Sequence, residues 1–221
     1  MTVRTQFEAE LGDLHATTLR MGAIVEGAIK DSVVALIRRD RDLAESVIHN
    51  DVNLNDMHRA MREHIFVVIA TQQPVARDLR MVMATQYIAA ELERIGDYAV
   101  RIAKRVMQLV DFPQSDPLVE LQQMGELVQR QVHDILDTLV RLDAEAATAV
   151  AERDHEVDRL YQHIFGDQIS SMAIRPHTAM AAQLIINIAH TLERIGDRVI
   201  NIAEDIVFLD SGEVVDLNET L

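Results

Sequence analysis

The sequence predicts an all-α protein of six long helices, arranged as two tandem antiparallel three-helix bundle repeats with pseudo-twofold symmetry. Three observations support this. The six residues Leu92–Asp97 recur unchanged as Leu192–Asp197, 100 residues later, which indicates an internal duplication. Apolar residues recur at steps of three and four over stretches too long for strands. Finally, 221 residues with 48% apolar content, few aromatics and only eight glycines and four prolines favour long helices over a turn-rich sheet.

The first repeat is expected to form helices at about 5–39, 42–70 and 75–110. Thr5 and Glu8 have the spacing of a capping box at the first start. Pro74 ends the second helix, because the residue before a proline avoids helical angles. The side chains expected to face inward from this helix are Leu54, Met57, Met61, Ile65 and Val68.

A linker with two prolines, 111–117, separates the repeats. Ser115 or Asp116 is expected to cap the next helix, with helices at about 117–141, 144–171 and 177–209. Arg175 and Pro176 separate the last two. The predicted units are therefore a first repeat, 1–112, a second repeat, 113–209, and a polar tail, 210–221, expected to be partly disordered.

The duplication extends beyond the six-residue identity. A shift of 103 residues matches Met21-Gly22 to Met124-Gly125 and Asp31 to Asp134, whereas the later motif matches at 100. The second copy has therefore lost three residues net near the loop before its last helix. A loop tolerates such a change in length.

Composition and charge exclude several classes of protein. The chain has no cysteine, so disulfides, thiolate metal sites and cysteine nucleophiles are absent. Its formal net charge of −15 argues against nucleic-acid binding, which needs a basic footprint. No apolar run approaches the roughly 20 residues that cross a bilayer, and the N-terminus has no hydrophobic signal core. We expect a cytoplasmic protein without membrane insertion.

The duplicated motif carries a pair of acidic residues. On a helix, Glu93 and Asp97 point the same way, nearly opposite the apolar stripe, and such a like-charged pair costs about 0.2–0.5 kcal/mol. Gly96 lies between them, although a glycine inside a helix costs about 1 kcal/mol relative to alanine. Its simplest use is to leave room beside the backbone. Glu193, Gly196 and Asp197 repeat the arrangement.

A second pair lies on the preceding helix of each repeat. It is Asp154 with Asp158 in the second repeat, and Asp51 with Asn55 in the first. Adjacent antiparallel helices can bring the two pairs together. Clustered carboxylates are compatible only if they are protonated, well hydrated or bridged by cations, and oxygen ligands favour hard cations such as magnesium, calcium, manganese or iron.

Other interpretations remain open. The acidic pairs can form a solvated face with Arg94 and Arg101 as partners. A di-iron carboxylate enzyme generally needs Glu-x-x-His on two helices, but Glu152 with His155 is the only match. No glycine-rich phosphate loop, nucleophile elbow, catalytic triad or anion cradle for phosphate is recognisable, so we do not expect an enzyme. Asp31 and Asp134 are either outer ligands or, preferably, polar residues at the bundle seam.

The motifs in combination closely resemble the PhoU family. They are Glu-Arg-Ile-Gly-Asp in both halves, the segment 73–80, His133-Asp134 and the six-helix repeat, and they cover about 7–209. The resemblance implies a cytoplasmic, mostly dimeric bundle that negatively regulates the Pho regulon and phosphate uptake. It acts between a phosphate ABC transporter, through its PstB-like ATPase, and a PhoR-like sensor histidine kinase.

The resemblance also implies metal sites, because some members hold multinuclear metal clusters on their Glu/Asp-x-x-x-Asp motifs. Asp51 with Asn55 departs from the pattern, since an amide oxygen is a weaker ligand. The expected metal is iron, zinc, manganese or magnesium. A metal-independent helical adaptor is the alternative. The implied ligands are Glu93, Asp97, Glu193, Asp197, Asp154 and Asp158, with Asp51 and Asn55 at the weaker position.

The two sites are expected to differ. Glu204 follows Glu193 at nearly the same helical angle, whereas Lys104 occupies the corresponding place in the first repeat. An added acid attracts cations and a lysine repels them. We therefore expect stronger metal retention at the site that contains Glu193.

Overall fold

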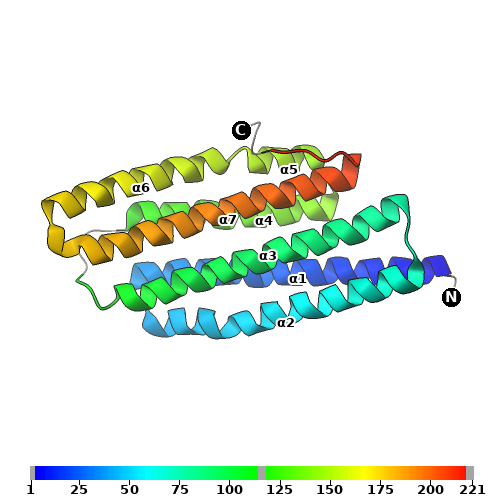
Figure 1. Cartoon of the computed structure of the whole chain (residues 1–221), viewed down its shortest axis with the longest axis horizontal. Helices are drawn as coiled ribbons and strands as arrows, with labels where there is room; N and C mark the ends of the chain where they lie inside the picture. The colour runs from blue at the N-terminus through cyan, green and yellow to red at the C-terminus, as the bar shows by residue number, and fades with distance from the viewer. Residues whose placement is uncertain (1–2, 114–117, 218–221) are drawn as a thin grey trace.

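The computed structural model describes residues 3–113 and 118–217, and within these ranges it contains helices and no strand. The predicted two-repeat, all-α architecture is confirmed (Figure 1). The first repeat consists of α1 (Val3–Arg38), α2 (Arg41–Gln72) and α3 (Ala76–Leu109). The second consists of α4 (Val119–Arg141), α5 (Ala144–Ala151), α6 (Asp154–Ile174), the short 3-10 helix η1 (Pro176–Thr178) and α7 (Ala179–Ser211).

The helix predicted over 144–171 is interrupted. Residues 152–153 separate α5 from α6, and neither is a glycine or proline that could have signalled the break. Arg153, at the break, donates to Asp134 of α4 with Nη2 2.6 Å from Oδ2. Asp134 is therefore a partner in an inter-helix ion pair, in keeping with a polar residue at the bundle seam.

One prediction at the N-terminal end of the chain needs correction. Because α1 begins at Val3, Thr5 lies inside the helix and is not its cap. In the described part of the segment after α7, Leu217 is buried and its N–H donates to Glu204 Oε1 at 2.9 Å. Partial disorder of the tail 210–221 stays a prediction. The predicted caps Ser115 and Asp116, and residues 218–221, lie outside the described ranges.

The duplication is visible in the local backbone geometry. Asp40 and Asp143, 103 residues apart, cap α2 and α5 by accepting a backbone N–H at 2.9 Å in each case. The preceding residues, Arg39 and Leu142, both adopt left-handed φ angles, 54° and 51°. These equivalent helix starts follow from equivalent sequence, because an aspartate at this position satisfies an N–H that has no helical partner.

The repeats pack against each other reciprocally. Gly22 of α1 lies against the Leu136 side chain of α4, and Gly125 of α4 lies against Val33 of α1. A shift of 103 residues relates Gly22 to Gly125 and Val33 to Leu136, so each contact is the counterpart of the other with the two repeats exchanged. The same exchange defines an isologous interface between two subunits. The inner helices α3 and α7 run antiparallel across the molecule (Figure 1).

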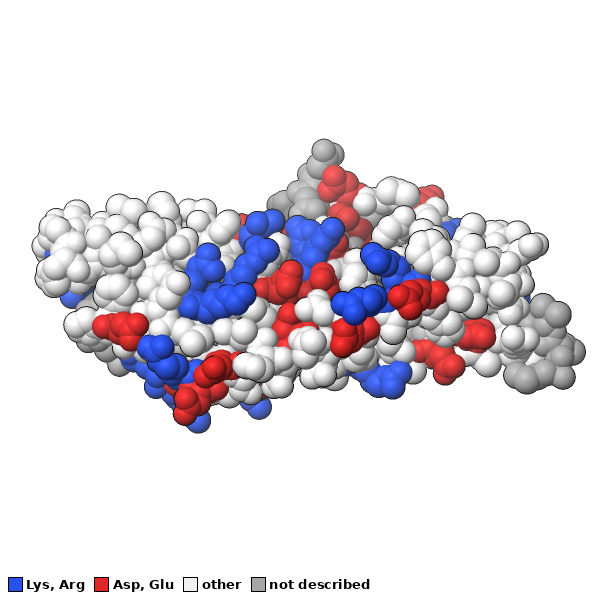
Figure 2. All heavy atoms as spheres, turned by 60° about the horizontal axis from the view of Figure 1, so that its bottom comes forward, with Lys and Arg blue, Asp and Glu red and all other residues white. Residues whose placement is uncertain are grey.

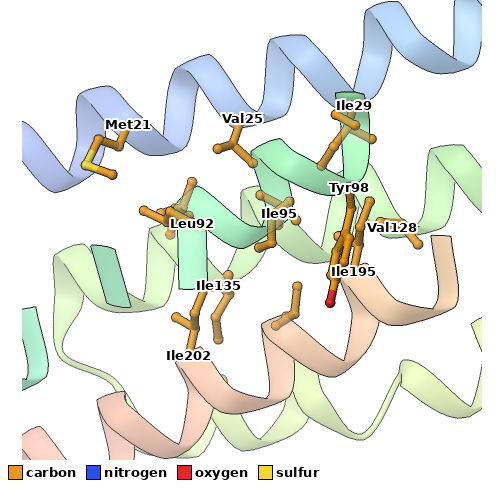
Figure 3. Close-up of a cluster of buried hydrophobic side chains, with 14 of the residues drawn as sticks. Met21, Val25, Ile29, Leu92, Ile95, Tyr98, Val128, Ile135, Ile195 and Ile202 are labelled. Atoms are coloured by element: carbon orange, nitrogen blue, oxygen red, sulfur yellow. The ribbon is translucent and has the colours of Figure 1, made fainter. Parts of the chain in front are cut away.

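Both repeats contribute to a single hydrophobic core. Figure 3 shows side chains from α1, α3, α4 and α7 meeting there, with Ile95 and Ile195 at equivalent positions near its centre. Both isoleucines have no exposed surface. Within the described residues, none of the helices is long and apolar enough to cross a membrane.

The glycine contacts between α1 and α4 predict a difference between two otherwise similar substitutions. A Cβ on Gly125 would lie 2.6 and 2.9 Å from the Val33 methyl groups, whereas a Cβ on Gly27 meets nothing within 4 Å. Both Gly→Ala variants gain the same helix propensity. We therefore expect Gly125→Ala to be less stable than Gly27→Ala by about 1–3 kcal/mol, the usual cost of overpacking. Urea denaturation measures this, and equal stabilities would contradict the reciprocal packing.

Candidate metal centre

The second acidic cluster joins α6 to α7. Asp154 and Asp158 come from α6, and Glu193 and Asp197 come from α7. Asp197 is close enough to raise the pKa of Asp154 and of Asp158 across the two helices. Asp154 and Asp158 in turn raise the pKa of Glu193. Gly196 makes this approach possible, because a Cβ there would lie only 2.0 Å from Asp154 Oδ1. The structure thus brings the four predicted residues of this repeat together.

The electrostatics of this cluster disfavour four separate negative charges. Burial, then Asp158 and Asp197, raise the pKa of Asp154 to about 7, although the Gln131 amide opposes the shift. Burial and the same neighbouring carboxylates raise the pKa of Glu193 to about 7. Asp154 Oδ1 and Glu193 Oε2 are buried without a hydrogen-bond partner. This environment favours a proton or a cation beside these oxygens.

The first cluster joins α2 to α3 and is less acidic. Asp51 and Asn55 come from α2, and Asn55 Nδ2 donates to Asp51 Oδ2 at 2.7 Å. Burial and Asp97 raise the pKa of Asp51, while Asn55 and Lys104 oppose the shift. Burial, Asp97 and Asp51 raise the pKa of Glu93. The four predicted residues of the first repeat are therefore also neighbours.

Gly96 allows α2 and α3 to approach at this cluster. A Cβ at Gly96 would lie 2.2 Å from Leu54 Cδ2 and 3.5 Å from Asp51 Oδ1. In both repeats, then, the glycine between the two acids of the motif faces the neighbouring helix. The expectation that it leaves room beside the backbone is confirmed.

The donor atoms fit a hard cation, but the ligand shell is not preformed. Within 3–113 and 118–217, no three His, Asp or Glu side chains already converge as a metal site. Side-chain rotation would have to complete the coordination. The second cluster fits better, because it offers four carboxylates and two buried oxygens without partners. Residues 51, 55, 93, 97, 154, 158, 193 and 197 stay predicted ligands.

The histidines near the second cluster do not form a di-iron motif. Glu152 lies in the break between α5 and α6, so Glu152 and His155 do not share a helix. The His155 ring instead faces the backbone carbonyl of Glu152. His190 Nε2 lies 3.9 Å from Glu193 Oε2, and the two side chains form a weak, partly exposed pair.

Two residues were predicted to make the clusters differ in cation affinity. The prediction for Glu204 is wrong, and the prediction for Lys104 is consistent with the structure. Glu204 does not extend the second cluster, because its Oε1 accepts from Leu217 and its neighbouring carboxylates are Asp216 and Glu91. The hydrogen bond to the C-terminal segment holds the Glu204 carboxylate outside the second cluster. Lys104 does act on the first cluster, since its charge lowers the pKa of Asp51.

Sequence reasoning missed a buried charge cluster between α3 and α7. Glu91 is 8% exposed and accepts from Arg94 Nη1 at 2.5 Å and from Arg198 Nη1 at 3.4 Å. Burial, then Glu91 and Glu204, raise the pKa of Asp205 to about 7. The available signal was the charged residue at position 91, on the edge of the apolar stripe of α3.

Comparison with known proteins identifies the family. The model of the PhoU domain matches twice, at residues 18–106 and 121–206. The chain belongs to the PhoU family. It is 37% identical over 217 residues to a Clostridium acetobutylicum homologue of the phosphate-specific transport system accessory protein PhoU, covering 98% of this chain and 99% of that one. Escherichia coli PhoU is 35% identical, over 94% of this chain and 86% of its own length.

Solved structures of PhoU proteins have the same fold. The crystal structure of PhoU from Pseudomonas aeruginosa superposes with a TM-score of 0.90 at 38% identity, covering 94% of this chain and all of that one (100%). PhoU from Streptococcus pneumoniae, described as a phosphate transport system regulatory protein, gives 0.89 at 30% identity, covering 95% and 99%. The recognised resemblance to the PhoU family is thus confirmed. The relatives are named as accessory or regulatory proteins of phosphate transport.

Asp205 predicts a pH dependence of stability. A carboxyl group whose folded-state pKa is raised contributes stability below its unfolded pKa, near 4, and loses it as the pH rises through the folded value. Asp205→Asn keeps the shape and removes the titration. Between pH 4 and 8, we expect the metal-free wild type to lose on the order of 2 kcal/mol relative to the variant.

Urea denaturation across this pH range measures the effect, with Asp210→Asn on the exposed end of α7 as the control. Wild-type and Asp205→Asn stabilities that change in parallel with pH would show that the carboxyl group at 205 is not held in this environment.

Proposed function

We propose that this protein restrains the phosphate-starvation response when phosphate is plentiful. It acts on the cytoplasmic side, between a phosphate ABC transporter and a sensor histidine kinase, and thereby lowers expression of the Pho regulon. The observation that carries this proposal is the match to PhoU accessory proteins over nearly the whole length of the chain, in both repeats. A homodimer is part of the proposal, since homo-oligomers with twofold symmetry are the commonest assemblies.

The proposal includes cation binding at the two acidic clusters. In the second cluster, Asp154 and Asp158 would hold the cation from α6, and Glu193 and Asp197 from α7. A bound cation supplies positive charge that neutralises these carboxylates. The residues themselves bind it and thereby link neighbouring helices, because each cluster draws ligands from two of them. The raised pKa values of Asp154 and Glu193 support this interpretation.

A second candidate is a metal-independent adaptor. Its support is the absence of a preformed ligand shell within the described ranges. The acidic clusters would then attract basic surfaces of partner proteins directly, in keeping with the net charge of −15. The adaptor keeps the regulatory role and differs only in what neutralises the carboxylates.

Loss of the gene tests the regulatory role. Because the proposed protein holds the response off at high phosphate, its deletion is expected to leave phosphate-starvation genes switched on in phosphate-rich medium. Transcript levels of the transporter genes measure this, with the wild-type gene restored on a plasmid as the control. Normal repression in the deletion strain would reject the role.

Metal retention is expected to differ between the repeats. The second cluster has four carboxylates and the first has three with an amide and a nearby lysine, so the second attracts a cation more strongly. The proteins are purified without chelator and dialysed against low free metal. Relative to the wild type, the loss of bound metal per chain is expected to be roughly tenfold larger for Glu193→Ala than for Glu93→Ala. Elemental analysis measures this.

The outcomes separate the two candidates. Equal loss from both variants would contradict the asymmetry. Negligible metal in the wild type, together with partner binding that survives replacement of Glu193 and Asp197 by alanine, would favour the metal-independent adaptor.

A further inference from the structure

The first acidic cluster opens into a pocket that also contains basic residues. The pocket has a volume of about 590 Å³ and lies between α2 and α3. Asp51, Asn55 and Glu93 line one part of it, and His58, Arg59 and Arg62 line another. A cation site and a basic rim thus share one cavity.

The order of these residues along α2 explains the arrangement. Positions 51, 55, 58, 59 and 62 recur at three- and four-residue steps, so they form one stripe on the helix surface. The stripe changes from carboxylate and amide oxygens at one end to guanidinium groups at the other. Figure 2 shows acidic side chains grouped across the middle of the face that α2 helps to form, with Lys and Arg side chains on both sides.

The basic groups have unused hydrogen-bonding capacity. His58 Nε2 is buried without a hydrogen-bond partner. Arg62 is exposed and forms no ion pair with the described residues, although it lies close enough to lower the pKa of His58. Among the residues that the structure describes, Arg59 pairs only with Asp56, at 3.1 Å, and both side chains are more than 60% exposed. Such a pair contributes little and is easily exchanged.

The second repeat has no equivalent of this basic rim. The residues that correspond to His58, Arg59 and Arg62 are Tyr161, Gln162 and Phe165. Tyr161 and Phe165 instead pack together, with ring centroids 6.2 Å apart. The basic rim is therefore a feature of the first repeat alone and not of the duplicated unit.

We propose that the pocket of the first repeat binds inorganic phosphate beside its cation, with Arg59 and Arg62 as the anion-binding residues. This inference rests on the proposed cation binding at the first cluster. Guanidinium groups form charge-assisted hydrogen bonds to phosphate oxygens, often two at a time. A hard cation held by carboxylates commonly keeps positions open that phosphate oxygens fill. The pocket combines both kinds of partner.

The carboxylates in the pocket make the two binding events depend on each other. Without a cation, Asp51 and Glu93 repel an anion in the same cavity. With the cation bound, its positive charge offsets much of that repulsion, and the arginines and cation attract phosphate together. Binding free energies are reciprocal, so phosphate tightens the cation by the same factor. The second repeat, which lacks the basic rim, retains its cation independently of phosphate.

The experiment measures binding to the full-length protein by isothermal titration calorimetry. The protein is titrated with Mn²⁺ alone, with inorganic phosphate alone, and with phosphate in the presence of Mn²⁺. The test variant is Arg59→Gln with Arg62→Gln. The matched control is Arg159→Gln, which removes an exposed arginine near the second cluster. We expect the wild type and the control to bind phosphate only with Mn²⁺ present, and the double variant to bind it at least about tenfold more weakly. Mn²⁺ binding without phosphate is expected to remain in all three.

Other outcomes would overturn the proposal. Unchanged phosphate affinity in the double variant would exclude the arginines, and equal affinity in the presence of a chelator would exclude coupling to the cation. Sulfate bound as tightly as phosphate would indicate a general anion site. If the wild type binds Mn²⁺ but binds no phosphate when both are supplied, this inference is rejected and the proposed cation binding is left intact. Failure to bind Mn²⁺ would reject both.

Discussion

The close approach of neighbouring helices at Gly96 and Gly196 is the constraint on which both acidic clusters depend. At each glycine, a Cβ would collide with a side chain of the adjacent helix, Leu54 in one repeat and Asp154 in the other. Carboxylates from two helices therefore come within electrostatic range. The cost of a glycine inside a long helix is offset by this packing, and the same arrangement occurs in both repeats because the unit is duplicated.

The close approach of the helices places partly buried carboxylates near one another, and neighbouring groups offset part of the resulting repulsion. Burial, and then the neighbouring like charges, raise the pKa of two carboxyls in the second cluster, Asp154 and Glu193, to about 7. The protein counters some of this charge with its own groups, Asn55 and Lys104 in the first cluster and Gln131 in the second. Two buried oxygens, Asp154 Oδ1 and Glu193 Oε2, nevertheless have no hydrogen-bond partner. A cation is the simplest group that satisfies them, and a basic partner surface is the alternative.

Much of this architecture could be predicted from sequence, because it follows from local pattern. The duplicated motif gave the two-repeat fold, and helical periodicity identified which acids share a face. Features that depend on tertiary packing could not be predicted. Nothing local signals the break at residues 152–153, and Leu217 is buried although its segment is polar. Glu204 lies at nearly the same helical angle as Glu193, but its carboxylate accepts a hydrogen bond from Leu217 of the C-terminal segment instead of joining the cluster.

The charged features that sequence reasoning missed have a common cause. Glu91, Arg94 and Arg198 form a cluster only because α3 and α7 cross. The basic rim of the first pocket was present in the sequence as a stripe on α2, but the sequence does not show that Glu93 of α3 lines the same cavity. The two repeats differ at these positions, and in our proposal this difference, rather than the shared motif, determines which ligands each cluster binds.

Cation binding between the helices can be tested by a crystal structure of the Mn²⁺-soaked protein with anomalous scattering recorded near the manganese absorption edge. An anomalous peak is expected between α6 and α7, within about 2.0–2.4 Å of carboxylate oxygens from Asp154, Asp158, Glu193 or Asp197. A map with no anomalous peak at either cluster would contradict cation binding there.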